Sequence, residues 1–308
     1  MIKKALILGA GGMVGKNLVE HAPSGIALLT PAHDELDLLS YNDVLEYFKT
    51  HNPDMIIHAA GIVGGIQANI ARPVKFLLEN ADMGRNVAWA AYNAGIDKMI
   101  NFGSSCMYPR DAKNPLKESM ILSGELEPTN EGYALAKIFT QRLCSYINRQ
   151  FDAFNYKTVI PCNLYGKYDT FDPEHSHMIP AVIRKIHAAK IHAQKTVEIW
   201  GEGTARREFM YATDLANMIW KYVSDFENMP ELMNLGLGHD HSINEYYHTI
   251  AGVIGYTGKF VHDKTKPVGM KQKLVDVSLQ KEHGLAPANS LKEGIEKTYA
   301  YYLKISAE

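Results

Sequence analysis

The sequence has few cysteines and little net charge, and each shortage narrows the class of protein. Only Cys106, Cys144 and Cys162 stand among 308 residues. This small, odd number fits reduced thiols in the cytoplasm better than a disulfide framework, so we expect a cytoplasmic protein. The formal net charge is −2, which lacks the basic excess that polyanion-binding proteins usually carry. We therefore expect no nucleic-acid partner.

Long hydrophobic runs are also missing. No uninterrupted apolar stretch reaches the roughly 20 residues that a membrane-spanning helix needs, so we expect no membrane partner. The N-terminus combines lysines with an apolar run, but that run is short and leads into glycines, and we interpret it as a first strand rather than a signal peptide. What is present is an ordinary globular composition, with 46% hydrophobic and 21% charged residues.

The first half of the chain alternates short apolar runs with longer helical patterns. The predicted strands cover residues 5–9, 26–30, 55–60, 99–104 and 157–162. This alternation predicts an α/β fold with a Rossmann-type, doubly wound parallel sheet. The second half is more mixed, and a turn-rich stretch follows residue 165. We predict a dinucleotide-binding domain over 1–165 and a smaller, mainly substrate-binding domain over 166–308, with some segments returning to the first sheet.

A glycine-rich turn follows the first predicted strand. In "GAGGMVG", Gly9, Gly12 and Gly15 are spaced three apart, with Met13 and Val14 opening a helix. Glycines allow a tight turn and close approach of the backbone to a pyrophosphate, and the helix N-terminus supplies N–H groups. Many turns are rich in glycine, so a purely structural turn is the alternative. The strand–helix units that follow favour a dinucleotide site.

The second strand should end with the residue that distinguishes NAD from NADP. An acidic residue there is typical of NAD, and an arginine is typical of NADP. The segment "LLTPAHDELDLL" has neither feature in clear form. His33 is the only nearby potential cation, and Asp37 and Leu38 could flank the adenine. These residues leave the choice of cofactor open.

Tyr133 and Lys137 stand four residues apart in "GYALAK", which places them on one face of a helix. A lysine ammonium close to a phenol lowers the phenol pKa, and Lys137 could also hold the nicotinamide ribose. Ser104 or Ser105, at the end of the fourth strand, would complete the hydrogen bonds to a substrate carbonyl oxygen. With the glycine turn, this pattern favours a carbonyl-reducing site.

Six stretches together resemble a known family. They lie at residues 58–73, 103–119, 126–138, 163–185, 200–211 and 266–277. The runs Gly-Ser-Ser-Cys, Val-Gly-Gly-Ile and Ser-His-Met-Ile-Pro are the most specific. The chain resembles the extended short-chain dehydrogenases/reductases, and within them the GDP-L-fucose synthases.

The resemblance implies an enzyme that acts on GDP-4-keto-6-deoxy-D-mannose with NADPH, with NAD possible. The C4 ketone acidifies the protons on C3 and C5, whose removal and return from the opposite face inverts both centres before C4 is reduced. The resemblance makes Cys106 the base and His177 the acid, beside catalytic Ser104, Tyr133 and Lys137. The alternative for Cys106 is a small buried hydrophobic residue.

Further positions follow from the resemblance. It places at the cofactor Ala59, Ala60, Pro161, Asn163 and Leu164. It assigns to the substrate Ser105, Asn163, His177, Lys185, Trp200, Arg207 and Asp276. An arginine fork suits the GDP diphosphate or ribose. Core packing is the alternative for Trp200, and we interpret Arg206 as a surface ion pair.

Asp172, Glu174 and His175 stand close to His177 in the sequence, and such a group could suggest a metal site. No ligand set has a definite spacing, so we predict no metal.

Several other functions share this fold. A 4,6-dehydratase would carry Asp-Glu where Ser105 and Cys106 stand, and a 4-epimerase has no need of a cysteine–histidine pair. A C4 reductase of a related GDP-4-keto sugar, such as a deoxyheptose or a dideoxy sugar, is the main alternative. A non-catalytic dinucleotide-binding regulator would tend to lose Tyr133 or Lys137.

The sequence also departs from the fucose synthases. Gly132 replaces a proline common there, and Ala212 and Thr213 replace Val-Asp. These changes bear on the substrate rather than on the fold. We also expect a homodimer, in which the helices at 74–94 and 133–151 pair as they do in relatives.

Overall fold

The computed structural model describes residues 2–172, 176–266 and 270–307. Within them, a six-stranded sheet forms the centre of what we call the Rossmann lobe. Every neighbouring pair of strands is parallel. The spatial order is β10 (Leu232–Leu235), β5 (Asn155–Pro161), β4 (Lys98–Phe102), β3 (Met55–His58), β1 (Lys4–Leu8) and β2 (Ala27–Leu29). The predicted doubly wound parallel sheet is thereby confirmed, and all five predicted strands are present.

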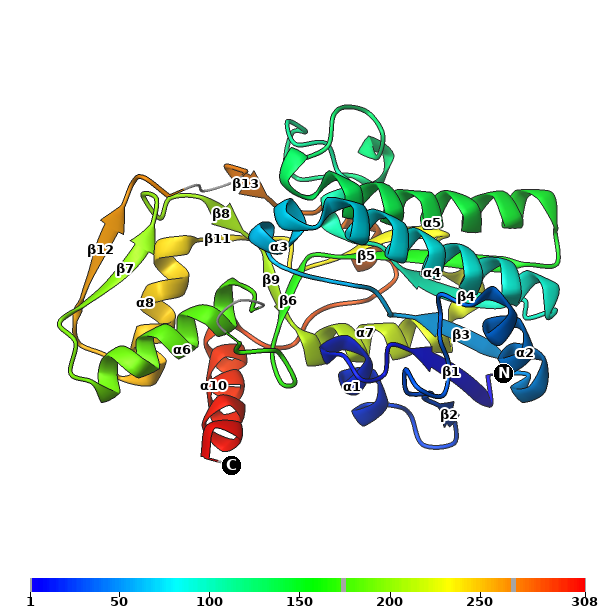
Figure 1. The fold of residues 1–308 in the computed structure, drawn as a ribbon, viewed down its shortest axis with the longest axis horizontal. Coiled ribbons are helices and arrows are strands. Elements are labelled where there is room, and N and C mark those ends of the chain that lie inside the picture. Colours follow the sequence, from blue (N-terminus) through cyan, green and yellow to red (C-terminus); the bar gives the residue numbers. More distant parts are fainter. Residues whose placement is uncertain (1, 173–175, 267–269, 308) are drawn as a thin grey trace.

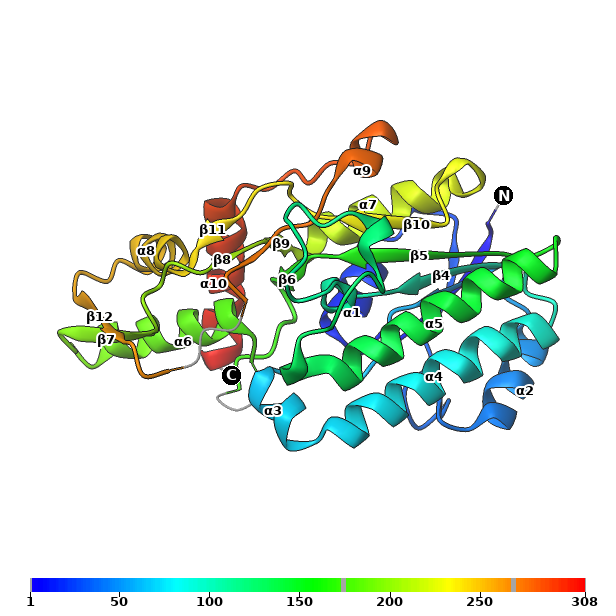
Figure 2. The same cartoon turned by 90° about the horizontal axis from the view of Figure 1, so that it is seen from above.

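Helices cover both faces of this sheet (Figures 1 and 2). One face carries α2 (Tyr41–His51), α4 (Pro73–Asn93) and α5 (Glu131–Gln150), and the other carries α1 (Met13–Glu20) and α7 (Ala212–Ser224). The central strands are buried on both faces, which explains their continuous apolar runs: all four residues of β3 are buried. Two elements from much later in the chain, α7 and β10, complete the Rossmann lobe.

Local signals determine where several helices begin and end. Ser40 accepts a hydrogen bond from the Asp43 amide at the start of α2, and Asn52 ends that helix in the left-handed conformation. At α8 (Ile243–Ile254), Ser242 and Glu245 form a reciprocal capping box, and Gly255 has a φ of 74°. Caps of this kind satisfy backbone groups that the helix itself leaves unpaired.

The remaining elements form what we call the C-terminal lobe, on the left in Figure 1. It contains α6 (Met178–Ile191), α8 and α10 (Leu291–Ala307), with a core of its own. Its strands are short: β7 (Thr196–Trp200) pairs with β12 (Lys259–Asp263), and a three-stranded sheet has the order β11 (His241–Ser242), β8 (Arg206–Arg207) and β13 (Gln272–Lys273). β6 (Asn163–Tyr165) pairs with β9 (Phe209–Tyr211) between the lobes.

Short segments connect these elements. They are α3 (Ile66–Ala71), η1 (Ser105–Met107), η2 (Glu118–Met120), η3 (Pro128–Asn130), η4 (Phe226–Asn228) and α9 (Ser278–Glu282). In the stretch at 273–277, Lys273 belongs to β13, and Val275 forms a single further bridge with Leu116.

Candidate active site

The glycine turn has the geometry that a dinucleotide needs. Gly9 has a φ of +85°, and a Cβ there would lie 2.7 Å from the Ala60 Cα. A Cβ on Gly15 would lie 2.1 Å from the Gly9 carbonyl oxygen, so the first turn of α1 packs directly on the end of β1. Gly12 is the N-cap of α1. A backbone this close-packed with free N–H groups at a helix N-terminus fits a pyrophosphate.

The side that would hold the adenine ribose is open. Gly11 is exposed, and a Cβ there would meet nothing within 4 Å. His33 is also exposed. The Leu38 carbonyl accepts a hydrogen bond from Asn86 at 2.9 Å, and the Asp37 carboxylate accepts one from the Leu39 amide at 2.9 Å. Asp37 therefore shapes its own turn.

Four of the predicted catalytic residues, Ser104, Cys106, Tyr133 and Lys137, lie together near the carboxyl ends of the central strands of the large sheet. Ser104 caps η1, and its hydroxyl accepts a hydrogen bond from the Cys106 amide at 3.4 Å. Lys137 is buried and donates to the Phe102 carbonyl at 2.9 Å, and its Nζ lies 5.7 Å from the centre of the Tyr133 ring. The structure thus brings residues of 104–106 next to residues 133–137.

The acidity of Tyr133 differs from what the sequence predicted. We expected Lys137 to lower the phenol pKa, but burial raises the pKa of Tyr133, Cys106 adds to the rise, and only a hydrogen bond with Ser104 opposes it. Burial also lowers the pKa of Lys137, to about 8. Removing both groups from water disfavours their charged forms, and this cost exceeds their mutual effect. Tyr133 is therefore a protonated donor in this structure.

Cys106 is buried, as its small apolar character alone would predict, but its surroundings are polar. It is 6% exposed. Burial raises the pKa of its thiol, and Lys273, Ser104 and Lys137 act in the opposite direction. Cys144 and Cys162 are also buried and free. For both, burial raises the thiol pKa, with no lysine opposing it.

His177 stands at the start of α6, where it is the N-cap residue. Burial lowers the pKa of its imidazole, so the ring is neutral at pH 7. Glu174 and His175 lie outside the described residues. Within the described ranges, no group of three His, Cys, Asp or Glu side chains could hold a metal ion.

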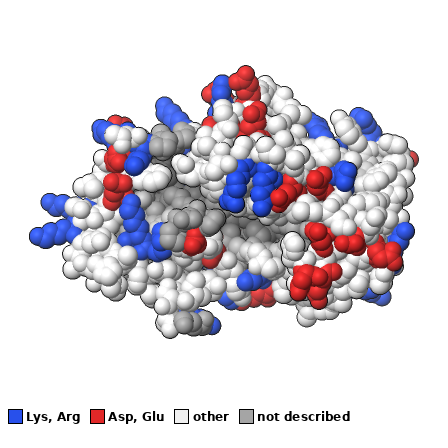
Figure 3. Space-filling model, viewed as in Figure 1, with Lys and Arg blue, Asp and Glu red and all other residues white. Residues whose placement is uncertain are grey.

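The residues expected at the nucleotide sugar lie in the C-terminal lobe and at its border. Lys185 donates to the Glu198 carbonyl and is partly buried. Trp200 is 50% exposed, with Lys266 Nζ 5.7 Å from its ring centre, so it is not a core residue. Figure 3 shows lysine and arginine side chains on either side of a hollow in this face.

Arg206 and Arg207 have different surroundings although they are neighbours. Arg206 Nε donates to the Asp240 carboxylate at 2.6 Å, which confirms the predicted ion pair. Arg207 is partly buried and donates to the Arg206 carbonyl at 2.8 Å. Burial lowers the pKa of Arg207, and Glu127 opposes that shift.

Asn163 and Asp276 make structural hydrogen bonds. Asn163 Nδ2 donates to the Glu208 carbonyl at 3.0 Å, which holds the end of β5 against β8 and β9. Pro161 and Leu164 flank this position on β5 and β6. The Asp276 carboxylate accepts the Ser278 amide at 2.9 Å, in the first turn of α9.

Sequence reasoning missed two residues at the junction of the lobes. Glu208 is 1% exposed and accepts from the backbone amides of Leu237, Gly238 and Val275. Burial raises its pKa to about 7. Lys273 pairs with Arg207 across β13 and β8, and it is the lysine with the largest effect on the pKa of Cys106. An acid directly after two arginines and before an apolar run was a possible signal for Glu208, whereas nothing in the sequence distinguishes Lys273 from other lysines.

Two departures from the fucose synthases have structural reasons. A Cβ on Gly132 would lie 2.9 Å from the Pro73 carbonyl oxygen, so the first turn of α5 packs tightly on the start of α4. The Thr213 hydroxyl donates to the Asn17 side chain at 2.9 Å and joins α7 to α1.

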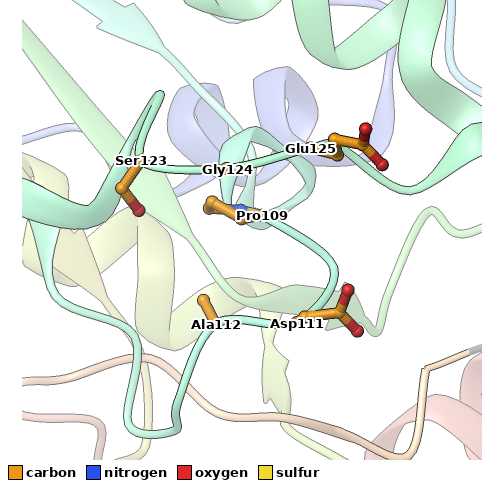
Figure 4. A pocket seen from close by; sticks show the side chains of 6 residues that line it. All are labelled: Pro109, Asp111, Ala112, Ser123, Gly124 and Glu125. Atoms are coloured by element: carbon orange, nitrogen blue, oxygen red, sulfur yellow. The ribbon is translucent and has the colours of Figure 1, made fainter.

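Two pockets differ in their relation to this site. One, of ≈ 180 Å³, is lined by residues of α3, α4, η3 and α5 and reaches Tyr133. The other, of ≈ 280 Å³, lies in the loop after η1 (Figure 4). Its carboxylates Asp111 and Glu125 both pair with Arg110, at 3.2 and 2.8 Å, so the lining has no free cation for a phosphate.

A parallel sheet with a glycine turn, a Ser-Tyr-Lys cluster and a second lobe defines a Rossmann-type oxidoreductase or epimerase. Residues 5–236 match the model of the NAD dependent epimerase/dehydratase family. The chain belongs to this family, and the resemblance to extended short-chain dehydrogenases/reductases is confirmed. Among the described residues, none of the helices combines the length and apolar character needed to cross a membrane.

Relatives of known name cover nearly the whole chain. It is 56% identical to GDP-L-colitose synthase of Yersinia pseudotuberculosis, over 97% of this chain and 98% of the relative. It is 49% identical to GDP-L-fucose synthase of Azorhizobium caulinodans, over 98% and 96%. A GDP-mannoheptose C4 reductase from Campylobacter jejuni, solved with NADP bound, has a TM-score of 0.89 and 31% identity, with 98% of each chain covered.

Proposed function

We propose that this protein is an NADPH-dependent 3,5-epimerase and C4 reductase that converts GDP-4-keto-6-deoxy-D-mannose to GDP-L-fucose. Its relatives act on nucleotide sugars, as their names state. The observation that carries the proposal is the placement of Cys106 in the same cluster as Ser104, Tyr133 and Lys137. A plain C4 reductase needs no thiol there, whereas inversion at C3 and C5 needs a base beside the sugar.

The residues of this chain divide the chemistry between them. Cys106, as thiolate, takes a proton from C3 or C5: the C–H bond breaks, an S–H bond forms, and the electron pair moves toward the C4 oxygen. His177, in its protonated form, returns a proton to the opposite face and becomes neutral, which inverts the centre. Tyr133 then donates its proton to O4, and Ser104 orients that oxygen.

The chain also fits the cofactor. Close packing at Gly9 and Gly15 would leave the N-terminus of α1 to bind the pyrophosphate, and Lys137 would hold the nicotinamide ribose. When bound, NADPH supplies the hydride for C4. The substrate diphosphate would pair with Arg207, whose guanidinium fork matches phosphate oxygens.

Deuterium uptake from D2O tests the epimerase part. Wild-type protein should exchange the protons on C3 and C5 of the GDP-4-keto sugar before any NADPH is added, as followed by NMR. Cys106→Ser should bind NADPH normally but lose exchange, because an alcohol is a far weaker base than a thiolate. His177→Asn should impair the same steps. If wild type exchanges neither proton, the enzyme is a plain C4 reductase; equal exchange by Cys106→Ser would place the base elsewhere.

A second candidate function is C4 reduction of a dideoxy GDP-4-keto sugar. The 56% identity to a GDP-L-colitose synthase favours it. Colitose is a 3,6-dideoxy sugar, so its precursor has no hydroxyl on C3 and needs inversion only at C5. Comparing kcat/KM for the 6-deoxy and the 3,6-dideoxy substrates decides between the two functions.

We further propose a homodimer formed through α4 and α5. Both helices present stripes of exposed apolar side chains: Val74, Leu78 and Trp89 on α4, and Leu135, Phe139 and Tyr146 on α5. The two helices lie side by side in Figure 2 and would form a four-helix contact with a second copy. Phe139→Glu should give a monomer in light scattering; an unchanged dimer would exclude this face.

We also place the protein in the cytoplasm, where its free cysteines would stay reduced.

A further inference from the structure

Lys273 lies on β13, and the register of that strand determines where it points. β13 pairs in parallel with β8, with Gln272 opposite Arg206 and Lys273 opposite Arg207. Paired residues share a face of a sheet and successive residues alternate. Asp240 accepts hydrogen bonds from both Arg206 and Gln272, each at 2.6 Å, so these two share one face. Lys273 therefore shares the opposite face with Arg207.

Backbone hydrogen bonds attach this segment to the loop that follows Cys106. The Leu116 amide donates to the Leu274 carbonyl at 2.8 Å, and the Asp276 amide donates to the Leu116 carbonyl at 2.9 Å. The Val275 amide donates to Glu208 at 3.0 Å, on the other side. Lys273 is thus held between the Cys106 loop and the strand that carries Arg207.

The charged groups around this lysine come from several elements. Burial lowers the pKa of Lys273, Arg207 lowers it further, and Cys106, Cys162 and Glu127 raise it. Burial raises the pKa of Cys106, and of the groups that oppose this rise Lys273 has the largest effect, followed by Ser104 and Lys137. Tyr133 also faces the thiol. Lys273 is therefore the main cation acting on Cys106.

We propose that Lys273 is a positioning residue that stabilises the Cys106 thiolate and so makes it a usable base. This inference rests on the proposed epimerase function. A thiolate out of water is costly, and a nearby cation offsets that cost. A substrate diphosphate on Arg207 would neutralise the charge that repels Lys273. Lys273 would then keep its proton when the sugar is in place, which links activation of the base to substrate binding.

The titration of the thiol tests this inference without any substrate. The ultraviolet absorbance of the thiolate is recorded against pH, and the Cys106→Ser spectrum is subtracted to isolate this thiol. Lys273→Met, measured against Lys273→Met/Cys106→Ser, should raise the thiol pKa by about one unit or more, which means at least about tenfold less thiolate at pH 7. Lys273→Arg should restore most of the loss. The matched control is Lys271→Met, an exposed lysine on the same segment, which should change nothing.

Two results would overturn the inference. One is an unchanged thiol pKa in Lys273→Met. The other is an unchanged thiol pKa accompanied only by a raised KM, which would make Lys273 a diphosphate ligand. Circular dichroism and NADPH affinity check folding, and Lys273→Gln serves if the methionine variant does not fold. If the proposed epimerase function itself is wrong, wild-type protein will show no deuterium exchange at C3 or C5, which is a different result from either of these two.

Discussion

The two lobes present their chemistry by different means. In the Rossmann lobe, the proposed cofactor site is shaped by main chain: Gly9 and Gly15 let backbone segments pack closely because they have no side chain, and the N-terminus of α1 would provide the N–H groups. In the C-terminal lobe and its border, the proposed roles of Arg207, Lys185 and Lys273 depend on long side chains on short strands and a helix. A backbone site needs only one continuous segment, whereas the side-chain site needs three segments to be held together.

Glu208 shows how the second kind of site is held. It is almost fully buried and accepts three backbone hydrogen bonds from two other segments. A buried acid with several amide donors stabilises one arrangement of the chain and disfavours others. The C-terminal lobe thus uses a polar junction where the Rossmann lobe uses close packing of glycine.

Loss of the Tyr133 hydroxyl should have the largest effect. Because burial keeps this phenol protonated, Tyr133→Phe removes the proton donor to O4. Reduction should fall by about a hundredfold or more, the usual range for a general acid. NADPH binding should be unchanged, since the ring remains. NADPH oxidation with the GDP-keto sugar measures the loss, and near-normal turnover by a folded variant would exclude this role.

The glycine turn gives a matched pair of variants. Gly9→Ala combines a positive φ with a Cβ that would lie 2.7 Å from the main chain of residue 60. It should cost roughly 1–3 kcal/mol of unfolding free energy and weaken NADPH binding. Gly11→Ala meets nothing within 4 Å and should behave as wild type. Thermal unfolding and NADPH titration compare the two variants. Equal behaviour would contradict the proposed role of the glycine turn in binding the pyrophosphate.

The pH dependence of reduction should reflect Lys137. Burial lowers its pKa from 10.5 to about 8, so the ammonium is charged below that pH and neutral above it. The value of kcat/KM should therefore fall as pH rises through about 8, approaching about tenfold per pH unit. Steady-state rates from pH 7 to 9.5 provide the measurement. A flat profile over that range would mean that the charge on Lys137 is not needed.

The smallest expected effect concerns the cofactor phosphate. Gly11 and His33 are exposed and supply no arginine for a 2′-phosphate, so we expect NADPH to be favoured over NADH only moderately. Gly11→Arg adds a cation in open space and should raise the NADPH preference by about tenfold, typical of one charge-assisted hydrogen bond. Values of kcat/KM for the two cofactors measure it. A strong preference of wild type for NADH would show that the family pattern fails here.

The sequence alone determined the parallel sheet, the glycine turn and the placement of Ser104 near Tyr133 and Lys137. Those features arise from hydrophobic periodicity, from the spacing of motif residues and from local backbone conformation, all of which can be recognised within a short segment. Tertiary structure alone decided the acidity of Tyr133 and Cys106, because desolvation depends on what surrounds a group. It also decided the place of Lys273, which is far from Cys106 in sequence but acts on its thiol through its charge, because strand pairing joins segments that are distant in the sequence.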